Sequence, residues 1–182
     1  VNVEKYSSKK NTEMLHSERS PYAKIQNPSQ VQIQSLINLY ENGKYVKVID
    51  KVQLLLKKFP QAVPLYNISG AAYTSLKKYN LAISYYKKAL AIDPDAAFLY
   101  LRMASIFKKI KKFDLAEESC RKFIKLEPGS AEGYYIMGNI LNVRGELDSA
   151  IENFKKATQI KPHHAEAYFN LGNIFKAKGN LE

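Results

Sequence analysis

The sequence contains no tryptophan and only one cysteine among 182 residues, so a framework of disulfide bonds is excluded. No apolar run approaches the roughly 18 to 20 residues that span a bilayer, and the first thirty residues lack the hydrophobic stretch of a signal peptide. Acidic residues are also scarce, with 17 Asp and Glu against 28 Lys and Arg. We therefore expect a basic, soluble, cytoplasmic protein that does not associate with membranes.

A hydrophobic share of 46% excludes wholesale disorder, and the length allows one domain or two small ones. Residues 1–28 differ from the rest, because they are rich in Ser, Lys, Asn and Glu and show neither helical nor strand periodicity. They are expected to form a disordered or loosely packed tail. A short docking segment around Ser20, Pro21 and Tyr22 is the alternative for this region.

The remainder of the chain has a period of 34 residues. Proline recurs with this step, a tyrosine follows each proline six residues later, and small and large apolar residues recur in the same register. The series are Pro60, Pro94, Pro128 and Pro162; Tyr66, Tyr100, Tyr134 and Tyr168; Gly70, Ala104, Gly138 and Gly172; Ala82, Ala116 and Ala150; and Tyr86, Cys120 and Phe154. So many parallel series predict a repeat protein.

This order of residues resembles the tetratricopeptide repeat over about residues 29–182. The resemblance implies an all-α, right-handed superhelical solenoid of antiparallel helix pairs, with about four and a half repeats. The repeats are expected at 29–62, 63–96, 97–130 and 131–164, with a half repeat at 165–182. The first repeat departs from the pattern, because Gln32 stands where tyrosine is expected.

The spacing of apolar and small residues supports two helices in each repeat. In 63–96 one set has the i, i+3, i+4, i+7 spacing of a helix face, and a second set does the same after a short turn. The first set is Tyr66, Ser69, Gly70 and Tyr73, and the second is Ala82, Tyr86 and Ala89. We expect the small residues at helix crossings, the rings between repeats, and Gly43, Gly145 and Gly179 as left-handed caps.

The sequence shows no pattern typical of catalysis. It lacks a nucleophile paired with a base, clustered carboxylates, a phosphate-binding glycine loop and metal-ligand spacing, so no catalytic residue, cofactor or metal site is predicted. Cys120 occupies the repeat position of Tyr86 and Phe154, which favours a buried apolar role over a reactive thiol. His163 and His164 are adjacent, so their side chains should diverge rather than share a metal.

Charge is unevenly distributed, because the whole net charge of +11 lies before residue 131. Its densest run is 108–112, at the end of a first helix. A basic edge favours an acidic protein or peptide partner. Nucleic acid is not expected, because the chain has 24 lysines but only 4 arginines, and arginine supplies the bidentate fork for phosphate and guanine. A merely solvated lysine-rich surface is the alternative.

The resemblance implies that the first helices line a concave groove. A row of Leu101, Tyr135 and Phe169 would cover apolar side chains of a ligand, and asparagines beside it would bond an extended backbone. The predicted groove residues are Asn67, Ala71, Thr74, Leu101, Ser105, Lys108, Tyr135, Asn139, Asn142, Phe169, Asn173 and Lys176.

Family members that bind the acidic tails of chaperones carry Lys, Asn, Asn, Lys and Arg at set positions. Only the last of the corresponding residues here matches, so a chaperone-tail clamp is not expected. These residues are Ile33, Ile37, Ile68, Phe98 and Arg102.

The sequence therefore predicts a non-catalytic module that binds a peptide or helix of a partner protein. One alternative is the recognition arm of a larger enzyme, because SQVQIQSLINLYENGKY followed by LYNISGAAY resembles repeat arrays ahead of bacterial sulfotransferase or glycosyltransferase domains. Another is a self-assembling scaffold. For self-association we expect Leu171 and Phe175 of the half repeat to form an apolar patch at the C-terminal end.

Overall fold

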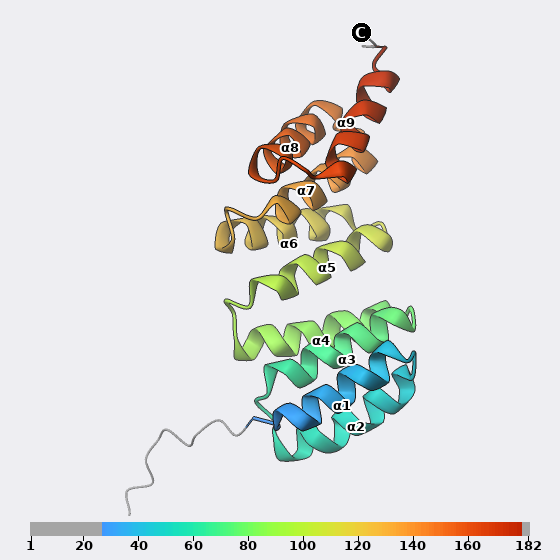
Figure 1. The fold of residues 1–182 in the computed structure, drawn as a ribbon, viewed down its shortest axis with the longest axis vertical. Coiled ribbons are helices and arrows are strands. Elements are labelled where there is room, and N and C mark those ends of the chain that lie inside the picture. The colour runs from blue at the N-terminus through green and yellow to red at the C-terminus, as the bar shows by residue number, and fades with distance from the viewer. Residues whose placement is uncertain (1–26, 180–182) are drawn as a thin grey trace, which may run out of the picture.

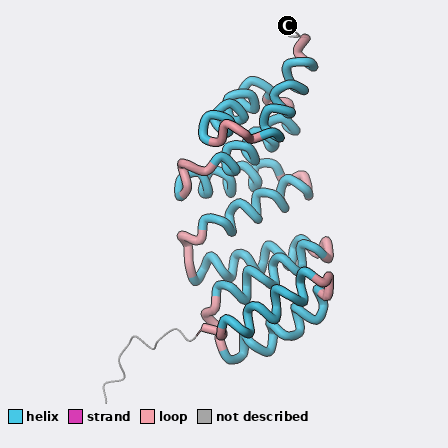
Figure 2. The backbone as a smooth tube through the Cα atoms, viewed as in Figure 1, coloured by secondary structure: helices cyan, strands magenta, loops and turns pink. Residues whose placement is uncertain are grey.

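The computed structural model describes residues 27–179, which form nine α-helices and no strand (Figure 2). The helices are α1 (Gln30–Glu41), α2 (Tyr45–Lys58), α3 (Val63–Ser75), α4 (Tyr79–Ile92), α5 (Ala97–Lys109), α6 (Phe113–Leu126), α7 (Ala131–Arg144), α8 (Leu147–Ile160) and α9 (Ala165–Ala177). Residues 1–26 of the expected tail lie outside the described residues.

The helices stack in antiparallel pairs along one long axis (Figure 1). Each second helix packs on its own first helix and on the first helix of the next pair; α9 packs on α8, and no second helix of its own lies among the described residues. The connections are short loops (Figure 2). The predicted all-α solenoid of helix pairs is therefore confirmed.

Small residues let the two helices of a pair approach each other. The ring of Tyr86 lies on Gly70, and the ring of Phe154 lies on Gly138, where an added Cβ would come 2.7 Å from Phe154 Cε1. Both rings are almost fully buried. The repeated small and aromatic positions are thus the two sides of one contact, as the sequence period predicts.

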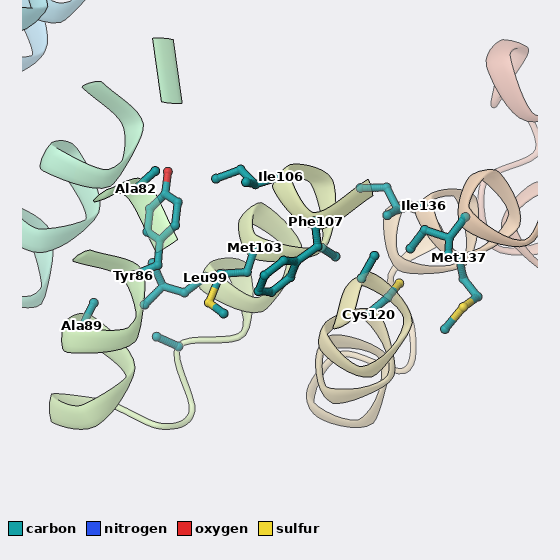
Figure 3. Close-up of a cluster of buried hydrophobic side chains, with 14 of the residues drawn as sticks. Ala82, Tyr86, Ala89, Leu99, Met103, Ile106, Phe107, Cys120, Ile136 and Met137 are labelled. Atoms are coloured by element: carbon teal, nitrogen blue, oxygen red, sulfur yellow. The ribbon is translucent and has the colours of Figure 1, made fainter. Parts of the chain in front are cut away.

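Buried side chains form one core that continues from pair to pair. Figure 3 shows part of it, from Tyr86 on α4 through Leu99 and Phe107 on α5 to Cys120 on α6 and Met137 on α7. Each pair thus buries its apolar face against its neighbours, which is how repeat proteins gain stability.

One residue in the turn that follows each first helix has a left-handed backbone conformation. The φ angles of Gly43, Gly145 and Gly179 are 70°, 83° and 73°, as predicted. The same position holds Lys77 and Lys111, with φ angles of 58° and 60°, which the sequence analysis did not anticipate. A lysine here carries the steric cost that glycine avoids.

Amide side chains lie on the outward face of α1 and in the turn after it, beside the exposed Val31. The Gln34 side chain donates a hydrogen bond to Asn38 Oδ1 at 2.8 Å, and the Asn42 side chain donates to the Asn38 backbone carbonyl at 2.7 Å. The corresponding positions in later repeats, one period apart from Asn38, are apolar and almost fully buried: Ala72, Ile106, Ile140 and Ile174. The first repeat therefore presents amides where the others present core side chains.

Candidate functional site

Residues from the four first helices α1, α3, α5 and α7 line a pocket of about 500 Å³. Three predicted groove residues on α5 line this pocket, namely Leu101, Ser105 and Lys108. Ala71 and Thr74 of α3 also line it. The central part of the predicted groove is therefore brought together in space.

The pocket also contains residues that the predicted groove set omits. Phe98 and Lys109 come from α5, and Glu132 and Ile136 from α7. Arg102 lines the pocket too, although the sequence analysis weighed it only as a chaperone-tail residue. Helical spacing was the available signal, because Phe98 lies three residues before Leu101, and Arg102 lies three residues before Ser105.

Tyr86 lines the base of the pocket from α4. Burial raises the pKa of its phenol, while the Thr74 hydroxyl and the Arg102 guanidinium act in the opposite direction. The Thr74 hydroxyl itself donates a hydrogen bond to the Gly70 carbonyl at 2.8 Å. Polar groups of α3 and α5 therefore meet around the Tyr86 ring.

The charge of the pocket is predominantly positive. Its lining includes three cationic side chains, Arg102, Lys108 and Lys109, and one carboxylate, that of Glu132. Burial lowers the pKa of Lys108, and the neighbouring Lys109 lowers it further. A partly desolvated ammonium beside a second cation favours the approach of an anion.

Two predicted residues on α7 make contacts within the protein instead of facing an open groove. The Tyr135 ring packs against the His164 ring at 4.7 Å and the Phe154 ring at 6.0 Å between centroids. Asn139 Oδ1 accepts a hydrogen bond from the Asn170 side chain at 2.9 Å. Tyr135 is thus partly a packing residue, contrary to the expectation that its side chain serves only the groove.

The predicted residue of α3, Asn67, is half-buried. Its Oδ1 atom is inaccessible to solvent and has no hydrogen-bond partner among the described residues. Its acceptor therefore does not face a ligand in this conformation.

The end formed by α9 differs from the expected apolar patch. Leu171, predicted for self-association, is only 8% exposed, and Phe175 is half-buried. Tyr168, expected in the core, is 52% exposed, and the groove residue Phe169 is 69% exposed. Leu171 lies on the buried face of α9. Tyr168 is exposed because no second helix packs on α9 among the described residues. Asn173 is exposed as well.

The described residues offer no metal-binding group of three or more His, Cys, Asp or Glu side chains. Cys120 is buried, its thiol donates to the Gly133 carbonyl at 3.2 Å, and burial raises the pKa of this thiol to about 12. The apolar role predicted for Cys120 is thus confirmed. His164 is also buried, with Nδ1 3.1 Å from Glu166 Oε2. None of the helices in 27–179 is long and apolar enough to cross a membrane.

Three family models match the chain. The model described as tetratricopeptide repeat matches residues 63–96, a second of the same description matches 99–130, and one described as TPR repeat matches 138–179. Together with the helix pairs, the small residues under the rings and the 34-residue period, these matches show that the chain belongs to the tetratricopeptide repeat family.

Solved structures with the same fold include the crystal structure of MamA, which is 28% identical, covers 79% of this chain and 84% of MamA, and has a TM-score of 0.72. The first TPR of Spaghetti (RPAP3), bound to the HSP90 peptide SRMEEVD, is 26% identical over 64% of this chain and 93% of that one, with a TM-score of 0.61. YrrB, a TPR protein with an unusual peptide-binding site, shares the fold at 22% identity, over 85% of this chain and 80% of YrrB, with a TM-score of 0.68. No curated protein sequence matches the chain.

Proposed function

We propose that the chain is a non-catalytic interaction module that binds a peptide or helix of a partner protein in its concave groove. The observation that carries this proposal is the pocket that α1, α3, α5 and α7 line together. A surface made from several repeats suits an extended ligand, because each repeat contributes side chains at a regular interval.

The similarity to the first TPR of Spaghetti supports the proposal, since that protein is bound to a peptide. The peptide SRMEEVD is acidic, and the pocket here is cationic. The mode of binding must nevertheless differ in detail. Of the five chaperone-tail positions, only Arg102 carries the expected residue type.

Selection of binding peptides from a random displayed library tests the proposal. The selected peptides should bind the chain in solution, and Ser105→Tyr should weaken their binding because a ring at this position obstructs the pocket. Ser84→Tyr is the matched control, since Ser84 is exposed on α4 and does not line the pocket. A library that yields no binder, or binders equally sensitive to both variants, contradicts the proposal.

Self-association is a second candidate, favoured by the exposed Tyr168 and Phe169 on α9. The similarity to arrays ahead of transferase domains stays a prediction.

A further inference from the structure

The junction between the second and third helix pairs is more open than the other junctions. The first helices pack on each other at α1 and α3 and again at α5 and α7, whereas α3 and α5, like α7 and α9, make less contact. The packing of α4 on α5 is also weaker than that of α2 on α3, α6 on α7 and α8 on α9. The ribbons of α4 and α5 diverge in Figure 1. The pocket of about 500 Å³ lies at this junction.

Side-chain hydrogen bonds join first helices at two other junctions but not at this one, where the Arg102 guanidinium of α5 acts on the Tyr86 phenol of α4. Tyr40 Oη lies 2.9 Å from Ser75 Oγ and joins α1 to α3, and the Asn170 to Asn139 hydrogen bond joins α9 to α7. Among the described residues no side-chain hydrogen bond joins α3 to α5 directly. Two of the residues that line the pocket have short side chains, Ala71 on α3 and Ser105 on α5. Space is therefore left where the neighbouring junctions are tied together.

The walls of this space are mainly apolar. Leu101, Ile106 and Phe98 of α5 line one side, and Ile136 of α7 and the Tyr86 ring complete it. Phe98 remains 44% exposed, although it lies beside the pocket. Apolar side chains with this much accessible surface gain free energy when a ligand covers them. The volume is within the range of about 300 to 1,000 Å³ found for small-ligand sites.

Cations lie at the edge of the same space. Arg102, Lys108 and Lys109 form no ion pair with a carboxylate of residues 27–179, in contrast to Arg121 and Arg144, which do. Burial lowers the pKa of Lys108, so its charge is poorly solvated there. A carboxylate from a ligand would restore the missing partner, and Arg102 can bind it with two parallel hydrogen bonds.

We propose that this pocket binds an acidic peptide by taking one large apolar side chain between α3 and α5 while neighbouring carboxylates contact Arg102, Lys108 and Lys109. The inference rests on the proposed function, of which it specifies the partner. An aromatic or leucine side chain would contact Leu101, Ile106 and Ile136. The peptide needs both features, because the apolar pocket provides most of the contact area and the cations orient the chain.

Binding of labelled peptides to the whole chain tests this inference. The probe has a phenylalanine with two glutamates on each side, and two matched controls replace either the phenylalanine by serine or every glutamate by glutamine. Fluorescence anisotropy should show that the probe binds at least about tenfold more tightly than either control, since truncation of a buried anchor commonly costs this much. Equal binding of the serine control, or of the glutamine control, would overturn the proposal.

Protein variants locate the contact. Ala71→Leu should fill the pocket and Arg102→Gln should remove a carboxylate partner, each weakening the probe about tenfold or more. The controls are Ala91→Leu and Lys155→Gln, which make the same kinds of change at exposed positions of α4 and α8. Circular dichroism establishes that all four variants keep the helical fold. Unchanged binding in both pocket variants would show that the peptide binds elsewhere.

The outcomes separate this inference from the proposed function. If library peptides bind and are sensitive to Ser105→Tyr but the acidic probe does not bind, the groove is a binding site and the assigned ligand class is wrong. If neither the library nor the probe yields binding, both proposals fail.

Discussion

The ring of Tyr86 lies directly over Gly70, so closely that a Cβ at position 70 would come 2.7 Å from its Cδ1 and Cζ atoms. Gly138 and Phe154 repeat this relationship, with 2.8 Å to Cδ1 of the ring. Gly172 occupies the same place in α9, but no atom lies within 4 Å of a Cβ added there. A side chain in place of glycine would therefore clash at positions 70 and 138 but not at position 172.

Gly138→Ala is expected to destabilise the fold by about 1 to 3 kcal/mol, because a methyl group overfills the contact with Phe154. Gly172→Ala should be neutral or stabilising by up to about 1 kcal/mol, since alanine favours the helix and has free space. Urea unfolding of the two variants measures the difference. Equal midpoints would contradict the role of the glycine in helix pairing.

Lys111→Gly should raise stability by roughly 0.5 to 1 kcal/mol, because glycine adopts the left-handed conformation of this position without steric cost. The adjacent Lys112 has an ordinary φ of −90°, so Lys112→Gly should instead lower stability. Thermal unfolding followed by circular dichroism compares the two. A lower melting temperature for Lys111→Gly would count against the conformational argument.

Tyr135→Ala should lower the melting temperature more than Phe169→Ala does. Tyr135 packs on His164 and Phe154, whereas Phe169 is 69% exposed and loses little contact. Truncation of a well-packed ring commonly costs about 3 kcal/mol or more, and a half-buried one less. If the two variants melt at the same temperature, the stacking on His164 contributes nothing measurable.

Cys120 should react slowly with thiol reagents in the folded protein. Burial raises the pKa of its thiol to about 12, so at pH 8 the nucleophilic thiolate is almost absent and access is blocked. Because the folded pKa lies above the unfolded one, this group favours unfolding only as the pH rises from about 9 towards 12. Labelling with a colorimetric disulfide reagent, with and without denaturant, checks this. Rapid labelling without denaturant would disprove the burial of the thiol.

The proposed association through α9 should depend on Tyr168 and Phe169 rather than on the buried Leu171. The double variant Tyr168→Ser with Phe169→Ser should reduce the concentration-dependent mass in light scattering and keep its helicity, because both side chains are largely exposed. Leu171→Ser should instead lower the melting temperature. A mass that does not depend on concentration in the unchanged protein would refute self-association.

The period of the sequence predicted the fold well, because each repeat imposes the same small and aromatic positions and their spacing determines the pairing. The helix caps at Gly43 and Gly145 were predictable for the same reason. Lys77 and Lys111 were not, since lysine carries no signal for a left-handed conformation. Lys77 and Lys111 have this conformation because they occupy the same repeat position as Gly43 and Gly145.

The candidate site was predicted only in its central part. Ser105 and Lys108 follow from the register of α5, but Phe98 and Glu132 lie in a second row that the predicted set left out. The packing of Tyr135 involves the ring of His164 in the next repeat. The residue pattern of a single helix cannot predict such a contact between repeats. The opening between α3 and α5 is likewise a property of packing between helices and not of any single helix.

The amides of Gln34, Asn38 and Asn42 on α1 give the stack two unlike ends. A further helix pair placed against this face of α1 would have to bury the Asn38 amide, whereas α9 exposes the rings of Tyr168 and Phe169. At the position of Asn38 the later repeats bury apolar side chains: Ala72, Ile106, Ile140 and Ile174. Joining copies head to tail is therefore disfavoured. A contact that joins the same face of α9 in two copies would be isologous, and it would close on itself as a pair.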